Sequence, residues 1–325
     1  MNPHGYYGYG GWGPPLPTLS ELQQQHWAAQ QQWQQAPSQT QAKADEDQAI
    51  SDTQSDCPSV GGELAPGQTQ MTSIPVLEKS SSKKRKKKSK VVVKEKKRAY
   101  MVPGPQSGGV PNPSPAYIAQ SARAPSQLDV PRRILVVMDL NGTLLHRPNA
   151  RKSSSFVERP YTRTFLQYCL QTFVVAIWSS AKPENVGRMV PQIVSDADRE
   201  RLAAVWGRDT LGLSVEDYNN RVQCYKRLER VWGDARVAAS HPEAHLGKRW
   251  DQTNTVLIDD SKEKARSQPY NIIQLPEFEG DVNEAGYVLP QVHNYLNELA
   301  FQSDISSFIR EKSFKFDPEF KLATV

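Results

Sequence analysis

The chain of 325 residues contains few features that could stabilise it other than an ordinary hydrophobic core. Cysteine is scarce, and Cys57, Cys169 and Cys224 show neither paired spacing nor the spacing of metal ligands, which indicates a reducing compartment. No apolar run is long enough for a membrane-spanning helix. The first residues resemble neither a secretory signal nor an Arg-rich transit peptide. We therefore expect no association with a membrane.

Apolar periodicity is almost absent from the first 130 residues, which consist of Gln-rich, Ser/Pro-rich and Lys-rich blocks. Such a composition cannot bury enough apolar surface to offset the entropy lost on folding. The sequence therefore predicts a disordered tail over 1–130, ending in a Pro/Ser/Gly linker over 101–131. Residues 131–325 have the composition of a globular protein and are predicted to form one domain.

The formal charge of +5 comes mostly from the tail. Residues 1–130 carry 14 basic and 10 acidic side chains, and the remainder carries 26 and 25. The predicted domain is thus almost neutral, and we expect nucleic acid to bind only through the basic tail. The dense basic block at 83–98 is typical of a nuclear import signal, so we expect an import receptor as partner and a nuclear protein, otherwise a cytoplasmic one. A solvated linker is the alternative interpretation of this block.

Within the predicted domain, apolar segments alternate with amphipathic ones. Strands are predicted at 134–138, 173–178, 255–258 and 272–275. Helices are predicted at 161–170, 183–190, 222–232 and 288–299. This alternation indicates an α/β fold with a Rossmann-like, doubly wound parallel sheet that is covered by helices on both faces.

Three of the predicted strands end in polar residues that are capable of chemistry. Asp139 follows the first strand, Ser179 follows the second, and the pair Asp259 and Asp260 follows the third. The carboxyl ends of parallel strands meet at one edge of the sheet, where such folds place their sites. One polar strand end is uninformative, but three of them, with Lys226 on an intervening element, indicate a functional crevice.

These residues carry a resemblance to a known family. The segments Asp139-Leu-Asn-Gly-Thr143, Trp178-Ser-Ser-Ala181 and Val256-Leu-Ile-Asp-Asp-Ser261, together with Lys226, resemble the four motifs of the haloacid dehalogenase superfamily. The match is closest to its carboxy-terminal-domain phosphatases and NLI-interacting-factor-like small phosphatases. Glu158-Arg-Pro160 adds to the resemblance, which covers about 131–300.

The resemblance implies a Mg²⁺-dependent phosphatase, a phosphoric monoester hydrolase, that acts on phosphoserine or phosphothreonine in proteins. Asp139 would attack phosphorus and form an aspartyl-phosphate. The Mg²⁺ ion would be held by Asp139, by the backbone carbonyl of Asn141, and by Asp259 or Asp260, which are oxygen ligands suited to this cation.

Two further side chains would bind the phosphoryl group in such an enzyme. The resemblance implies that the Ser179 hydroxyl donates a hydrogen bond to a phosphoryl oxygen and that Lys226 supplies a positive charge to the same group. Without the other motifs, a serine after a strand would be interpreted as a helix cap, and a single lysine as part of a solvated helix face.

Asn141 departs from the family pattern, which has a second aspartate at this catalytic position. That aspartate protonates the leaving oxygen and later activates water, whereas an amide of similar shape cannot transfer a proton. General acid–base catalysis typically contributes ~10²–10⁴-fold to a rate. We therefore expect reduced turnover, while the fold, the metal site and the nucleophile are retained.

Two other functions remain open at the level of sequence. The chain could be a catalytically impaired member that binds phosphoproteins or scaffolds a nuclear complex. A more remote alternative is a family member that serves as a receptor in the mitochondrial translocase. The retention of Asp139, Lys226 and the aspartate pair favours the enzyme, because a scaffold does not require a nucleophile.

Overall fold

The structure is a computed structural model that describes residues 100–149 and 155–322. The predictions for 1–99, including the basic block at 83–98, lie outside these residues. In the part of the chain that is described, no helix combines the length and the apolar character needed to cross a membrane.

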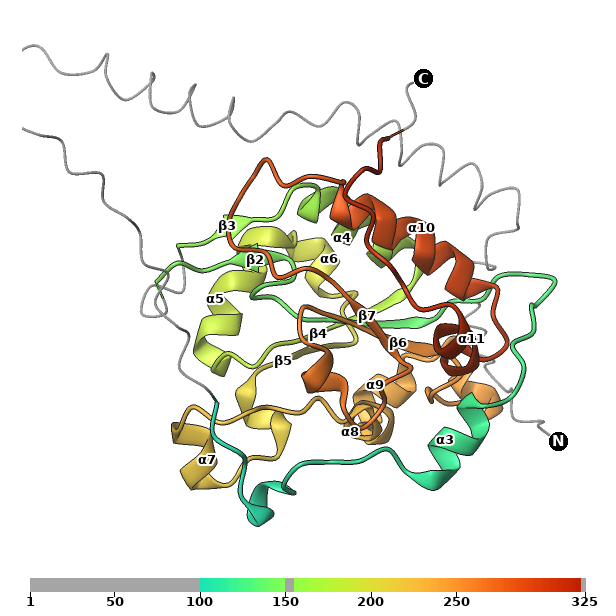
Figure 1. Ribbon diagram of the computed structural model, residues 1–325, viewed down its shortest axis with the longest axis horizontal. Helices are drawn as coiled ribbons and strands as arrows, with labels where there is room; N and C mark the ends of the chain where they lie inside the picture. Colours follow the sequence, from blue (N-terminus) through green and yellow to red (C-terminus); the bar gives the residue numbers. More distant parts are fainter. Residues whose placement is uncertain (1–99, 150–154, 323–325) are drawn as a thin grey trace, which may run out of the picture. The chain divides into compact units, whose positions relative to one another are not determined.

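Five strands in the described residues form one parallel sheet, in the order β5-β4-β1-β6-β7 (Figure 1). The strands are β1 (Leu135–Met138), β4 (Val174–Trp178), β5 (Ala204–Trp206), β6 (Thr255–Asp259) and β7 (Ile272–Gln274). The predicted α/β parallel sheet is confirmed. The short strand β5 was not predicted; it has only three residues, and one of them, Val205, is exposed.

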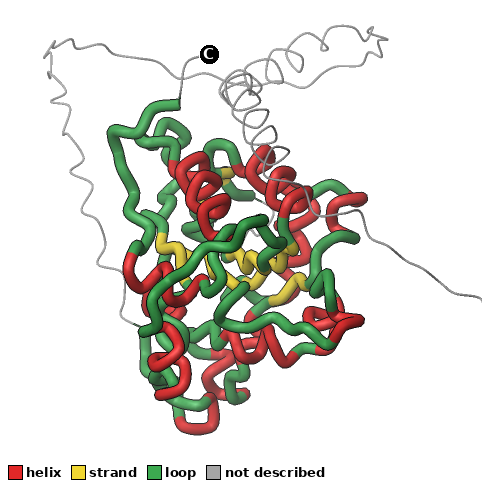
Figure 2. Tube along the Cα trace, turned by 90° about the vertical axis from the view of Figure 1, so that its right-hand side faces the viewer, coloured by secondary structure: helices red, strands yellow, loops and turns green. Residues whose placement is uncertain are grey.

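Helices cover both faces of the sheet because successive side chains of each strand point to opposite sides. Val136 and Met138 pack with α4 (Thr162–Thr172), α5 (Pro183–Ile193), α10 (Val288–Ala300) and α11 (Ile305–Glu311). Leu135 and Val137 pack on the other face with α8 (Leu228–Gly233) and α9 (Ala235–Ala239). Figure 2 shows the strands in the middle with helices above and below them.

The remaining elements are short and lie in the connections. They are α3 (Pro115–Ser121), α6 (Asp196–Arg199), α7 (Val215–Asn219), the antiparallel pair β2 (Leu145–His146) and β3 (Val157–Glu158), and the 3-10 helices η1 (Pro105–Ser107), η2 (Arg208–Leu211), η3 (Ala244–Leu246) and η4 (Lys262–Ala265).

The helix predicted over 222–232 is wrong in its first half. Only α8 is helical there; the segment before it begins with Val222 in a bridge and ends with Arg227 in an extended conformation, and none of its residues is helical. The reason is that their backbone groups are hydrogen-bonded elsewhere: Gln223 N donates to the Met101 carbonyl at 2.8 Å, and Lys226 N donates to the Lys264 carbonyl at 2.7 Å. This extended segment, rather than a helix, carries Lys226.

The linker predicted over 101–131 is also wrong, because residues 100–123 pack along the domain; we call them the N-terminal strap. Met101 forms a parallel bridge with Val222. Helix α3 begins in the usual way, with the Ser114 side chain accepting a hydrogen bond from Tyr117 N at 3.2 Å and Pro115 at the first helical position. One of the prolines in this segment, Pro115, therefore begins a helix. Composition alone does not distinguish such a proline from one in a linker.

Tyr117 attaches the strap to the loop before β7. Its side chain is 3% exposed, its hydroxyl donates to Asn271 Oδ1 at 2.9 Å, and it accepts from Tyr270 N at 2.9 Å. Gly104 N donates to Asp217 Oδ2 at 2.8 Å, which fastens the other end of the strap. The folded unit that the structure describes thus begins near residue 100.

The Tyr117 attachment yields a stability prediction. Tyr117→Phe should lower the free energy of unfolding by about 1–3 kcal/mol, because the buried amide oxygen and the backbone N–H lose their partner. Tyr100→Phe is the matched control, since the Tyr100 side chain is 58% exposed and should give a change below ~0.5 kcal/mol. Urea denaturation of both variants measures the difference. Equal effects would show that the hydrogen bonds of the Tyr117 hydroxyl do not contribute to stability.

Candidate active site

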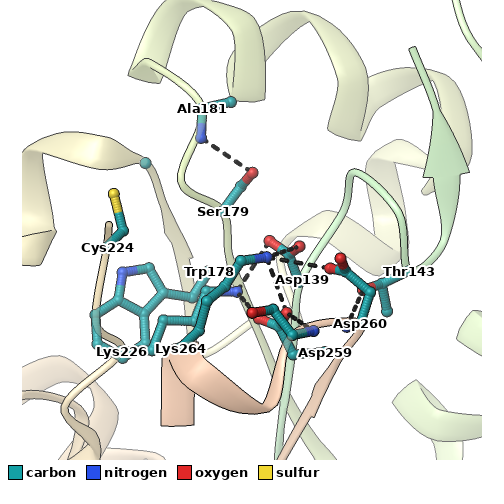
Figure 3. Close-up of polar contacts among 12 residues, drawn as sticks. Asp139, Thr143, Trp178, Ser179, Ala181, Cys224, Lys226, Asp259, Asp260 and Lys264 are labelled. Atoms are coloured by element: carbon teal, nitrogen blue, oxygen red, sulfur yellow. Dashed lines mark hydrogen bonds and ion pairs between the residues drawn. The ribbon is translucent and has the colours of Figure 1, made fainter. Parts of the chain in front are cut away.

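The carboxyl ends of β4, β1 and β6 lie side by side, as the sequence predicted, and bring their polar residues to one place (Figure 3). Asp139 directly follows β1 and is buried, and Asp259 is the buried last residue of β6. Ser179 follows β4 and is also buried. The central position of β1 places Asp139 between the other two strand ends.

Lys226 enters this group of carboxylates from the extended segment before α8. Its Nζ atom lies 2.9 Å from Asp139 Oδ1 and 2.7 Å from Asp259 Oδ2, and its side chain is fully buried. Burying an ammonium group or a carboxylate is unfavourable unless an opposite charge lies beside it. Loss of Lys226 or of either carboxylate would therefore leave a buried charge without its partner. The predicted position of Lys226 is correct, and its role in phosphoryl binding stays a prediction.

A second lysine, Lys264, completes the cluster, and it was not among the residues predicted for the site. Its Nζ atom lies 3.0 Å from Asp139 Oδ2, 2.8 Å from Asp259 Oδ1 and 3.1 Å from Asp260 Oδ1. The sequence offers two lysines in the same turn, and only the structure shows that Lys264 points inward while Lys262 is exposed. We call Asp139, Asp259, Asp260, Lys226 and Lys264 the charge cluster.

Burial and the neighbouring charges shift the pKa values of Asp259, Asp260 and Lys264. Burial raises the pKa of Asp259, but the attraction of Lys226 and Lys264 outweighs burial and lowers this pKa to about 2. Burial raises the pKa of Asp260 to about 7, with Lys264 opposing and the charges of Asp139 and Asp259 adding to the rise. Burial would lower the pKa of the Lys264 ammonium, but its carboxylate neighbours hold it well above its ordinary value.

The oxygen atoms at this site fit a Mg²⁺ ion. Asp139, Asp259 and Asp260 each offer a carboxylate oxygen, and these oxygens lie within 4.8 Å of one another. The fourth predicted ligand, the backbone carbonyl of Asn141, follows Asp139 by two residues, and its role in metal binding stays a prediction. Mg²⁺ prefers carboxylate, carbonyl and water oxygens, so the donor set has the chemistry that this cation needs.

The loop after β1 is shaped to bring Asp260 close. Gly142 has φ +84°, and its N–H donates to the Leu145 carbonyl at 2.8 Å. A Cβ atom at Gly142 would lie 3.0 Å from Asp260 Cγ. The Thr143 hydroxyl accepts a hydrogen bond from Asp260 N at 3.1 Å, which joins the loop to the end of β6. Glycine is therefore required at position 142 both for its backbone angle and for the space.

Arg159 supports the same loop from inside the protein. Its fully buried side chain donates to the Thr143 carbonyl and to the Pro276 carbonyl, each at 2.9 Å, and it is paired with Glu284. Arg159 belongs to the Glu158-Arg-Pro160 segment noted in the sequence. It thus connects the loop after β1 to the loop after β7.

Ser179 lies beside the charge cluster, and its hydroxyl is aligned by local structure. Its Oγ atom accepts a hydrogen bond from Ala181 N at 3.2 Å, and its own N–H donates to the Trp206 carbonyl at 2.9 Å (Figure 3). In this bond the Ser179 oxygen is the acceptor, so the hydroxyl hydrogen is still available to donate to a phosphoryl oxygen. Phosphoryl binding by Ser179 remains a prediction.

Comparison with known proteins supplies the family context for this site. The profile of a family described as NLI interacting factor-like phosphatase matches residues 134–306. An FCP1 homology domain-containing protein of the fission yeast Schizosaccharomyces pombe is 33% identical over 219 residues, which are 63% of this chain and 86% of that protein. A CTD phosphatase-like protein of Invertebrate iridescent virus 6 is 25% identical over 137 residues, covering 40% of this chain and 65% of its own.

Two solved structures of the RNA polymerase II CTD phosphatase Fcp1 also match. The first has 17% identity and a TM-score of 0.32, and the match covers 46% of this chain and 44% of that one. The second is the fission yeast enzyme bound to beryllium fluoride, with 16% identity, a TM-score of 0.32, and coverage of 58% of this chain and 59% of that one.

The loop geometry gives a prediction for Gly142. Gly142→Ala should lower the free energy of unfolding by ~1–3 kcal/mol and weaken Mg²⁺ binding, because the added Cβ is strained at positive φ and pushes Asp260 aside. Gly187→Ala is the control: no atom lies within 4 Å of its Cβ, and the helical site should gain ~0.4–1 kcal/mol. Denaturation and calorimetric Mg²⁺ titration of both variants check this. Unchanged Mg²⁺ binding in Gly142→Ala would contradict the role given to the loop.

Proposed function

The chain belongs to the NLI interacting factor-like phosphatase family, whose FCP1 homology domain is a haloacid dehalogenase-like phosphatase fold, and we propose that it is a Mg²⁺-dependent phosphoprotein phosphatase. The observation that carries this proposal is the position of Asp139. This carboxylate is buried at the end of the central strand and lies between two ammonium groups. Together with Asp259 and Asp260, it offers a set of oxygen atoms suited to bind Mg²⁺.

The proposed reaction has two displacements at phosphorus. An oxygen of Asp139 attacks the phosphoryl group, a P–O bond to aspartate forms, and the bond to the serine or threonine oxygen breaks; because Asn141 has no proton to give, this oxygen takes its proton from solvent. Water then attacks the aspartyl-phosphate and loses a proton to solvent, which releases inorganic phosphate and regenerates the carboxylate. Bound Mg²⁺ would neutralise phosphoryl charge during both steps. Lys226 holds Asp139 Oδ1 at 2.9 Å and thereby fixes the orientation of the nucleophile.

Phosphoserine or phosphothreonine in proteins is the proposed substrate class. Support comes from the family and from the viral relative, whose name refers to a CTD phosphatase. A phosphate monoester dianion would also be attracted by two neighbouring cations, Mg²⁺ and the Lys226 ammonium.

The second candidate function is a catalytically impaired, phosphoprotein-binding scaffold, and the observation that favours it is Asn141. The Asn141 amide occupies the acid–base position, and its buried side-chain oxygen cannot exchange a proton. Binding of a phosphorylated partner would need only the cation and the lysines. The two functions differ in whether an aspartyl-phosphate forms and turns over.

The leaving group distinguishes these functions. A serine alkoxide must be protonated as it leaves, whereas a nitrophenolate departs without a proton. We therefore expect the full-length protein to release a burst of nitrophenolate from an aryl phosphate and then to turn over slowly, because no base activates water at the second step. Asn141→Asp should raise turnover by about 10²-fold or more, and more on phosphoserine peptides than on aryl phosphates.

Controls keep this test decisive. Asp139→Asn should abolish both the burst and the steady state. Intact mass spectrometry must show that Asn141 has not deamidated, because the Asn141-Gly142 pair could create the aspartate spontaneously. The full-length chain is used because the N-terminal strap is part of the fold. If Asn141→Asp changes nothing and Asp139→Asn retains activity, the site does not transfer phosphoryl groups and the scaffold is favoured.

Nuclear import through the basic block at 83–98 is also proposed, on the basis of the sequence. Replacing the lysines of 83–88 by alanine should leave a fluorescently tagged protein mainly in the cytoplasm, because a charge-reading import receptor loses its ligand. Cell fractionation and fluorescence microscopy measure the ratio of nuclear to cytoplasmic protein. Unchanged nuclear accumulation would reject the signal, and mitochondrial localisation of the unaltered protein would favour the translocase-receptor alternative.

A further inference from the structure

We propose that the Lys264 ammonium is the internal counter-cation of the three site carboxylates, and that Mg²⁺ binds by displacing it. This inference rests on the proposed Mg²⁺ site and adds a positioning residue, Lys264, that controls access to that site. Figure 3 shows the Lys264 side chain reaching the three aspartates alongside Lys226.

The first argument is the use of hydrogen-bond donors. An ammonium group has three N–H donors. Lys264 Nζ is within 3.1 Å of one oxygen from each of Asp139, Asp259 and Asp260, so each donor has a carboxylate. The same three residues offer the oxygens that fit Mg²⁺. The ammonium therefore engages the ligand set of the metal and cannot keep all its bonds when a cation is held there.

The second argument is charge balance. With all three carboxylates ionised, as Mg²⁺ binding requires, the carboxylates and the two ammonium groups together carry one negative charge in excess. Mg²⁺ added to this cluster would leave one positive charge in excess, with two cations repelling each other across a few ångströms. If Mg²⁺ instead replaces the Lys264 ammonium, the three negative charges of the carboxylates are balanced by the three positive charges of Mg²⁺ and Lys226. Exchange is thus electrostatically preferable to addition.

The third argument concerns the nucleophile itself. Lys226 forms an ion pair with Asp139 Oδ1, and Lys264 donates a hydrogen bond to Asp139 Oδ2, so an ammonium group lies against each oxygen of the carboxylate. Attack on phosphorus requires one oxygen to be released. The Lys226 side chain is fully buried, whereas that of Lys264 is 14% exposed and lies on a 3-10 helix of four residues. Lys264 is the group that can turn outward.

Metal affinity provides the test. In the full-length protein, Lys264→Met removes the ammonium and keeps the apolar stem, so calorimetric titration with MgCl₂ should show affinity higher by about tenfold or more, since a charge-assisted hydrogen bond no longer has to be broken. Lys262→Met is the matched control from the same 3-10 helix and should bind as the unaltered protein does. With a chelator present, Lys264→Met should also unfold at a lower temperature, and Mg²⁺ should raise that temperature more than in the unaltered protein.

A measurement on the unaltered protein avoids any dependence on the folding of the variant. Reductive methylation read out by mass spectrometry should label Lys264 slowly without Mg²⁺ and faster with it, while labelling of Lys262 stays constant. Equal or weaker Mg²⁺ affinity in Lys264→Met, or unchanged labelling of Lys264 when Mg²⁺ binds, overturns the exchange and leaves the phosphatase proposal standing. Absence of Mg²⁺ binding in both proteins overturns the phosphatase proposal as well.

Discussion

Mutual compensation of buried charge at the ends of β1 and β6 is the constraint on which the rest of this structure depends. Carboxylates taken out of water repel each other and lose hydration, so they are stable only with cations at hydrogen-bond distance. Here the cations come from two separate places in the chain, Lys226 and Lys264, and a backbone hydrogen bond between these two residues joins their segments. The extended path of residues 222–227 follows from this requirement.

Two features of the surrounding structure hold these charges in place: the pairing of β1 with β6, and the loop after β1. The parallel register fixes Asp139 beside Asp259, because β1 and β6 pair residue by residue up to Met138 and Ile258. The loop after β1 is kept close by Gly142 and by the buried Arg159, whose guanidinium reaches carbonyls of two loops. A site of this kind is preorganised, and the energy that orders it comes from the core on both faces of the sheet.

Much of this could be predicted from the sequence, and the reasons for success and failure are physical. The strands β1, β4 and β6 are continuous apolar runs buried on both faces, and that pattern is strong. Asp139, Asp259 and Lys226 could be found because their positions relative to the strands carry the motif. Lys264 could not be selected, since a 3-10 turn of four residues determines which lysine faces inward.

The N-terminal strap was missed for a related reason. Proline-rich composition predicts a linker, and only the Ser114-Pro115 pair indicates a helix start. Strand β5 likewise gains its stability from pairing with β4, which is a long-range contact that a three-residue segment does not reveal. In each case a tertiary contact overrides the local preference.

The strap has a mechanical consequence. Met101 is hydrogen-bonded to Arg221 and Gln223, which lie in the segment that carries Lys226. Met101 is only three residues after Arg98, where the basic block ends. Tension applied at Met101 would act first on these two backbone hydrogen bonds and, through them, on the segment that carries Lys226. Displacement of Met101 would therefore be felt by one of the two lysines that lie against the nucleophile.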